Sequence, residues 1–145
     1  MTEGATTHGR LHATAVAVDG RGLLITGASG AGKSALAIAL IGLGAKLISD
    51  DQTQVSREGG VVTLRCPTPA LHGVIEARGV GLLRAEAIEA APLILVVDLD
   101  RYESDRLPPR RNVSVLGATI DLVYGTDNPI FPVALMLHLR HGRHA

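Results

Sequence analysis

Aromatic side chains are scarce in this sequence: its 145 residues include no Trp, two Tyr and one Phe. The hydrophobic share is nevertheless 46%, so the core must be built mainly from Val, Leu, Ile and Ala. That composition is typical of a sheet buried beneath helices. The length is that of one ordinary domain, and no repeat or linker divides it. We therefore expect residues 1–145 to form a single domain.

Several other features are missing as well. The single Cys66 excludes an internal disulfide framework, and the 14 basic residues are balanced by 14 acidic ones. No apolar run approaches the roughly 20 residues that cross a bilayer, and the first ten residues lack the apolar stretch of a signal peptide. These absences favour a cytoplasmic protein and give no support to a nucleic-acid or membrane partner.

The apolar segments that are present alternate with glycine and proline breaks, which predicts a series of short elements. We expect strands at 11–19, 23–26, 46–49, 93–100 and 118–124, a hairpin at 53–56 and 61–64, and helices at 34–43 and 130–140. An antiparallel hairpin combined with buried strands predicts a mixed sheet. The fold class is therefore α/β, a P-loop nucleotide-binding fold with a mixed β-sheet flanked by helices.

A phosphate-binding loop is the strongest signal in the chain. The pattern G-x-x-x-x-G-K-[ST] is matched between a predicted strand and a predicted helix by Gly27, Ala28, Ser29, Gly30, Ala31, Gly32, Lys33 and Ser34. In such a loop the glycines let backbone N–H groups turn toward phosphate oxygens at the positive end of the helix dipole. Lys33 supplies a charge for the β- and γ-phosphates, and the Ser34 hydroxyl is placed to bind Mg²⁺.

Three further motifs accompany the loop. The segment LISDD places Asp50 and Asp51 sixteen and seventeen residues after Ser34, and E-x-R-G-x-G and D-R-L segments begin at Glu76 and Asp105. His12 stands fifteen residues before Gly27. Together with the phosphate loop, these motifs make the chain resemble the catalytic domain of HPr kinase/phosphorylase, a bifunctional regulator of bacterial sugar uptake. The resemblance runs from about His12 to the end of the chain.

The resemblance implies an ATP- and Mg²⁺-dependent kinase that phosphorylates a serine of HPr or an HPr-like phosphocarrier. It implies that an aspartate of the Asp50–Asp51 pair, for which we favour Asp51, takes the proton of the target serine. Glu76 would complete the Mg²⁺ shell with Ser34, Arg106 would stabilise charge on the transferred phosphoryl, and His12 would belong to the catalytic site. A homo-oligomer, specifically a hexamer, is implied too.

The sequence departs from the family pattern in two ways that affect activity. The N-terminal domain of full-length members is absent, so the resemblance predicts a short form consisting of the catalytic domain alone. The family's P-G-R-N-like segment, associated with phosphorolysis, is replaced by Tyr124–Asn128, which contains no arginine. We therefore expect kinase activity, and phosphorolysis of the seryl-phosphate only as a possible second activity.

Alternatives remain at this point. The strand LILVVDLD resembles a Walker B strand, on which Asp98 or Asp100 would serve the Mg²⁺ ion instead of the residues named above. For the whole chain, the alternatives are a nucleotide-dependent regulatory binding module without catalysis and a P-loop kinase of a small metabolite. No motif predicts which nucleobase is bound.

Overall fold

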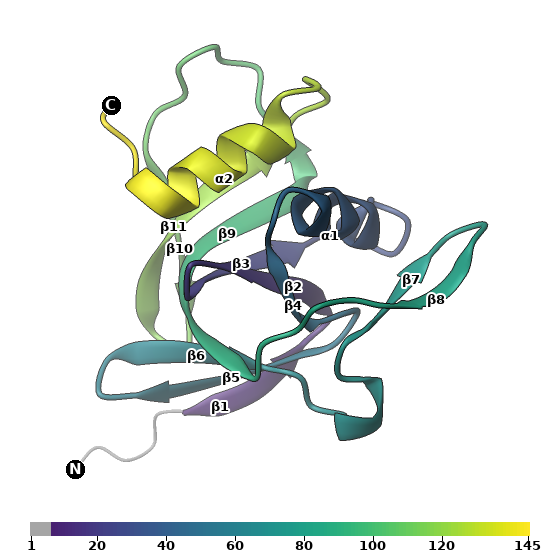
Figure 1. The fold of residues 1–145 in the computed structure, drawn as a ribbon. Coiled ribbons are helices and arrows are strands. Elements are labelled where there is room, and N and C mark those ends of the chain that lie inside the picture. Colours follow the sequence, from purple (N-terminus) through teal and green to yellow (C-terminus); the bar gives the residue numbers. More distant parts are fainter. Residues whose placement is uncertain (1–6) are drawn as a thin grey trace.

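The computed structural model describes residues 7–145, within which eleven strands and two α-helices follow one another along the chain (Figure 1). The strands are β1 (His8–Leu11), β2 (Ala13–Val18), β3 (Arg21–Thr26), β4 (Lys46–Ser49), β5 (Thr53–Glu58), β6 (Val61–Arg65), β7 (Val74–Ala77), β8 (Gly81–Arg84), β9 (Ala90–Tyr102), β10 (Arg111–Val115) and β11 (Ala118–Gly125). The helices are α1 (Lys33–Gly42) and α2 (Phe131–His141), with a short 3₁₀ helix at Pro69–Leu71.

Nine of these strands form one mixed sheet in the order β1-β5-β6-β9-β3-β2-β4, with β11 and then β10 alongside β9. The neighbours β3, β9 and β11 run parallel, whereas β2 is antiparallel to both β3 and β4. The mixed sheet expected from the sequence is confirmed. Because β3, β9, β11 and β4 all point the same way, their last residues lie along one edge of the sheet.

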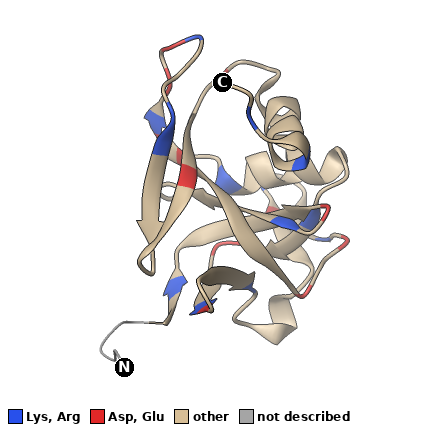
Figure 2. Ribbon diagram, turned by 90° about the vertical axis from the view of Figure 1, so that its left-hand side faces the viewer, with Lys and Arg blue, Asp and Glu red and all other residues tan. Residues whose placement is uncertain are grey.

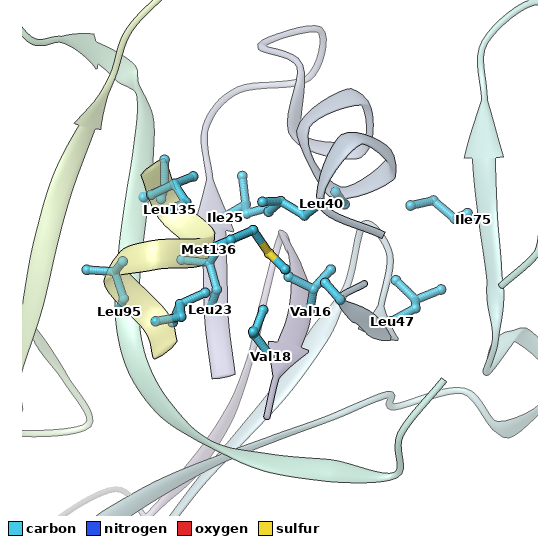
Figure 3. Close-up of a cluster of buried hydrophobic side chains, with 14 residues drawn as sticks. Val16, Val18, Leu23, Ile25, Leu40, Leu47, Ile75, Leu95, Leu135 and Met136 are labelled. Carbon is cyan, nitrogen blue, oxygen red and sulfur yellow. The ribbon is translucent and has the colours of Figure 1, made fainter. Parts of the chain in front are cut away.

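Both α-helices cover the same face of the sheet (Figures 1 and 3). Leu40 of α1 and Leu135 and Met136 of α2 are buried with Leu23 of β3 and Leu95 of β9 in one hydrophobic cluster. The first residue of α1 is Lys33, the lysine of the phosphate loop. The packing of α1 against the sheet therefore anchors the loop at a fixed place.

The opposite face is covered by the sheet itself. The strands β1, β5 and β6 curl beneath the central strands β9 and β3 of the same sheet (Figure 1). As a result, Val55 of β5 and Leu64 of β6 pack with Leu24 of β3 and Val96 of β9 in a second buried cluster. Successive residues of β9 therefore enter different clusters, Leu95 the first and Val96 the second. Burial on both faces explains why the successive residues Leu95, Val96 and Val97 are all apolar instead of alternating with polar ones.

The strands β7 and β8 form a separate two-stranded hairpin that projects from the sheet beside α1 (Figure 1). The sequence did not predict this hairpin, or the strands β1 and β10. Gly79 in the turn has φ +86°, a left-handed conformation that suits glycine. Only Ile75 of the hairpin is buried, so the strands carry little of the hydrophobic pattern from which strands are recognised.

Charged residues of both signs are distributed over many elements (Figure 2). No helix within residues 7–145 has the length and apolar character needed to cross a bilayer.

One ion pair gives the fold a pH-dependent contribution. The Arg111 guanidinium donates two hydrogen bonds, both 3.2 Å, to Glu103 and lies 4.1 Å from the Tyr124 ring centroid. The hydrogen bond from Arg111 lowers the pKa of Glu103 below its ordinary value of 4.5. A lowered folded-state pKa means that the pair stabilises the fold above pH 4.5, and that this contribution is lost as the pH falls through the lower value.

Thermal unfolding of the wild type and of Glu103→Gln should show the pH-dependent stabilisation by the Arg111–Glu103 pair. We expect the wild type to be the more stable at neutral pH and the difference between the two to shrink below pH 4.5. A difference in melting temperature that stays constant down to pH 3 would contradict the assignment.

Candidate active site

The phosphate loop lies where several strand ends meet. The loop follows Thr26 at the end of β3, and Asp50 follows Ser49 at the end of β4. Between these strands, β2 pairs Ala13 with Thr26 and Ala15 with Ser49. Its antiparallel direction places the start of β2, and thus His12, at the same edge. The fold thereby brings His12 into contact with Asp51, which is 39 positions away in the chain.

The loop backbone has the conformation that its glycines were expected to provide. Gly27, Gly30 and Gly32 have φ values of +150°, +85° and +101°, a region that other residues rarely adopt. A Cβ atom on Gly27 would stand 3.1 Å from Ala31 Cβ and 3.2 Å from Leu99 Cβ. Gly27 is therefore required both for its conformation and for the close approach of the loop to β9.

Lys33 is buried, with 7% of its surface exposed. Its ammonium group donates hydrogen bonds to the carbonyl oxygens of Gly27 at 2.8 Å and Ala28 at 3.1 Å. An ammonium has three N–H donors, so one remains for a phosphate oxygen. The side chain thus braces the loop and brings a positive charge to it.

Asp50 is held by three donors from different segments. The Ser34 hydroxyl donates to Asp50 Oδ1 at 2.7 Å and the Thr14 hydroxyl to the same oxygen at 3.0 Å, while the Glu76 N–H donates to Oδ2 at 3.1 Å. Asp50 therefore ties α1, β2 and the β7–β8 hairpin together at the phosphate loop.

Asp51 has different surroundings. Its Oδ1 lies 2.7 Å from His12 Nε2, and its N–H donates to Thr14 Oγ1 at 3.2 Å. Its backbone φ is +69°, which is uncommon outside glycine. The turn directs the two adjacent carboxylates to different partners: the carboxylate of Asp50 is engaged by three donors, whereas that of Asp51 contacts His12 and is largely exposed.

A cavity of about 500 Å³ opens above the loop. Lys33 and Ser34 line it together with Asp51, Glu76 and Arg78. The structure therefore gathers most of the predicted site at one cavity, with Asp50 and His12 in contact with its lining residues. Arg106 is the exception: it is exposed in the connection between β9 and β10 and is not among the residues that line the cavity.

The residues around Ser34 fit a magnesium ion that binds together with a nucleotide. The atoms that could coordinate the metal ion are all oxygen atoms, from the Ser34 hydroxyl and from the carboxylates of Asp50, Asp51 and Glu76. Mg²⁺ prefers oxygen and usually takes only one or two protein ligands beside phosphates and water.

The aspartates of β9 stand on the other side of the loop. Asp100 Oδ1 accepts a hydrogen bond of 2.9 Å from the Ala28 N–H, and Asp98 Oδ1 accepts one of 2.9 Å from the Asp100 N–H. Asp100 thus fastens the beginning of the loop, while Ser34 contacts Asp50 instead of either residue. The contact between Asp100 and the loop could not be predicted from the sequence, since it joins segments 72 positions apart.

Thr14 was also missed, although it contacts both aspartates of the pair. It is fully buried, and in the sequence it looks like one more small residue of an apolar strand. We expect Thr14→Val, which keeps the shape but removes the hydroxyl, to destabilise the fold by about 1–3 kcal/mol because two partly buried hydrogen bonds, one of them to a carboxylate, are lost. Catalytic turnover should fall by about tenfold or more, because Asp50 and Asp51 are no longer held in place.

The matched control is Thr53→Val. Thr53 is equally buried, but its hydroxyl donates to the Ala13 carbonyl oxygen and to neither aspartate. Chemical denaturation and steady-state kinetics of both variants measure the two effects. Equal losses of turnover in the two variants would show that Thr14 acts only through general stability.

Comparison with known proteins gives a consistent result. The profile of the HPr Serine kinase C-terminal domain family matches residues 4–110. The chain is 31% identical over 146 residues to HPr kinase/phosphorylase of Alkaliphilus metalliredigens. The aligned region covers 92% of this chain and 47% of that protein. It is 41% identical over 125 residues to the enzyme of Burkholderia lata, covering 78% of this chain and 38% of that protein. The chain thus spans less than half the length of these relatives.

A solved structure shares the fold. The Hpr(Ser) kinase/phosphatase from Coxiella burnetii superposes with a TM-score of 0.76 at 23% identity, covering 91% of this chain and 94% of that one. The P-loop α/β architecture expected from the sequence is thereby confirmed. With the phosphate loop, the aspartate pair and the family profile in agreement, the chain belongs to the HPr serine kinase C-terminal domain family.

Proposed function

We propose that the chain transfers the γ-phosphoryl group of ATP to a serine hydroxyl of HPr or an HPr-like phosphocarrier. The observation that carries this proposal is the cavity that joins the phosphate loop to Asp51. On one side are Lys33 and Ser34, which suit a triphosphate, and on the other is a carboxylate that can accept a proton. Phosphoryl transfer requires little more than positioning, charge neutralisation and such a base.

Asp51 is the better candidate for the base. The three donors on Asp50 fix that carboxylate in a structural network, whereas Asp51 lines the cavity. As the serine oxygen bonds to the γ-phosphorus, its proton passes to Asp51 and the bond to the β-phosphate oxygen breaks, releasing ADP. With Asp51 ionised, His12 Nε2 donates to it and holds it in position.

Ser34 and Glu76 would hold the Mg²⁺ ion, with Asp50 orienting Ser34. When bound, the ion neutralises charge on the β- and γ-phosphates. Arg78 lines the same cavity and is a second cation suited to phosphate oxygens. Arg106, implied by the family resemblance, would have to approach from its exposed loop, so we assign it no contact here.

The test is incubation of the purified chain with γ-³²P-labelled ATP, Mg²⁺ and HPr, followed by separation of all products. The proposal predicts label on HPr. Label on a small molecule of a cell extract instead of HPr would indicate a metabolite kinase, and ATP binding without any transfer would indicate a regulatory binding module. Either of the latter results would overturn the proposed function.

Phosphorolysis should be weaker than phosphorylation. The Tyr124–Asn128 segment contains no cation, and the nearby Arg111 is already engaged by Glu103 and Tyr124. A missing charge-assisted hydrogen bond costs about 1.5–3 kcal/mol, which corresponds to a phosphate-dependent reaction that is roughly ten- to a hundredfold slower. ATP keeps its remaining contacts with the loop.

Two rates measured on the same preparation check this expectation: phosphorylation of HPr by ATP, and dephosphorylation of seryl-phosphorylated HPr by inorganic phosphate. Equal catalytic efficiency in the two directions would refute it.

We also propose a cytoplasmic homo-oligomer, with a hexamer as the specific expectation. A single, partly buried cysteine suits a reducing compartment. Ile130, Val133 and Leu137 are exposed apolar residues at one face and the start of α2, which suits a subunit contact. Light scattering coupled to size-exclusion chromatography measures the state directly.

A further inference from the structure

A second, smaller hollow lies next to the phosphate cavity and has no role in the steps described above. Its volume is about 310 Å³, and it shares Gly32 with the larger cavity. Leu36 of α1, Leu99 of β9 and Phe131 at the start of α2 contribute its apolar wall, and Asp127 and Asn128 after β11 contribute polar groups. We refer to it as the β11 groove.

The sheet order indicates what lies in this groove. The strand β3, which carries the phosphate loop, has β2 and β4 on one side and β9 and β11 on the other. Asp51 follows β4, so a γ-phosphate directed at Asp51 lies on the first side. The rest of the nucleotide then leaves the loop toward the second side, where Leu99 and Asp127 line the β11 groove.

We propose that the β11 groove binds the nucleobase of the nucleoside triphosphate. This proposal rests on the proposed function, because it takes the triphosphate to be held by the phosphate loop. A base is a flat ring that stacks on apolar and aromatic side chains, and Phe131 with Leu36 and Leu99 provides such a surface.

The polar groups of the groove match the edge of a base. Asn128 Oδ1 accepts a hydrogen bond of 3.0 Å from the Ile130 N–H, so its amide nitrogen is left as a donor. Asp127 Oδ1 accepts one of 3.2 Å from the Tyr102 hydroxyl, which leaves its other oxygen as an acceptor. Bases present both amino donors and ring-nitrogen or carbonyl acceptors along one edge. A neighbouring donor and acceptor therefore suit this ligand.

The competing location is the part of the phosphate cavity between Ile38 and Arg78. A base placed there would lie on the same side of the loop as Asp51, where the serine of the acceptor must enter. The β11 groove leaves that side open, and this favours it.

The first experiment compares the binding of ATP and of ribose 5′-triphosphate, which is the same molecule without its base, by calorimetry in the presence of Mg²⁺. We expect the wild type to bind ATP about tenfold or more tightly than ribose 5′-triphosphate, since the base adds stacking. Asn128→Ala should weaken ATP binding by about three- to tenfold and leave ribose 5′-triphosphate unaffected. Asn112→Ala, which changes the chain's other asparagine, an exposed residue of β10, is the matched control.

The outcomes separate the two proposals. If the wild type binds neither ligand, the proposed function fails and the nucleobase assignment falls with it. If the wild type binds both ligands equally, or if Asn128→Ala weakens both equally or neither, triphosphate binding stands and the β11 groove is refuted. Thermal unfolding of each variant shows whether the loss of the contact to Ile130 has altered the fold.

The second experiment needs no variant. Photolabelling of the wild type with 8-azido-ATP, followed by mass spectrometry of the peptides, should place the label within residues 124–132. Label within residues 74–84, the β7–β8 hairpin, would put the base beside Arg78 and overturn the proposal.

Discussion

Lys33→Ala should abolish phosphorylation of HPr and weaken ATP binding by roughly ten- to a hundredfold. The side chain contributes twice: its ammonium bridges the carbonyl oxygens of Gly27 and Ala28, and it supplies the positive charge for the phosphates. A charge-assisted hydrogen bond is worth about 1.5–3 kcal/mol in binding, and the loss of a donor to transition-state charge slows turnover by about a hundred- to a thousandfold.

The control for this variant is Lys46→Ala. Lys46 is the chain's other lysine, and it is exposed on β4, so its removal leaves the net charge equal to that of Lys33→Ala. Calorimetric titration with ATP and Mg²⁺, together with the rate of label transfer, measures both effects. A folded Lys33→Ala protein with near-normal kinase activity would contradict the role of the loop.

The second large effect is expected for the aspartates. Asp51→Asn should keep ATP affinity within a few-fold of the wild type but lower turnover by about a hundred- to ten-thousandfold, because an amide cannot accept the serine proton. Asp98→Asn should leave turnover within a small factor, because Asp98 contacts the Asp100 N–H and Arg101 but neither Lys33 nor Ser34.

This pair of variants decides between the two interpretations of the sequence. If Asp98→Asn were inactive while Asp51→Asn remained active, the apolar strand β9 would be a functional Walker B strand and the assignment to the aspartate pair would be wrong. Circular dichroism and thermal unfolding of both proteins exclude misfolding as the cause.

The parts of the fold that could be predicted from the sequence are those whose pattern is local. β4 was predicted with the observed bounds, because the apolar segment at 46–49 is delimited by Gly44 and the aspartates. β10 was missed since it lies in a charged segment and alternates polar with apolar residues over only five positions. It is a strand because it pairs with β11. The residues of β10 themselves do not reveal that a pairing strand follows later in the chain.

The same distinction holds at the site. The phosphate loop and the aspartate pair were found because motif and spacing are properties of the chain itself. Thr14 was not found, and Asp100 was considered only as a metal-linked acid, because the role of each depends on a contact across the sheet, to Asp50 in one case and to the Ala28 N–H in the other. The different environments of Asp50 and Asp51 likewise required the structure, since adjacent identical residues cannot be distinguished by type.

The most direct test of the whole account is the identification of the phosphorylated residue on HPr. Wild-type chain and Asp51→Asn are each incubated with ATP, Mg²⁺ and HPr, and the HPr is sequenced by tandem mass spectrometry. The account predicts phosphoserine at a single position with the wild-type chain and at most a trace with Asp51→Asn. Unmodified HPr with the wild-type chain, or the same amount of phosphoserine with both proteins, would contradict it.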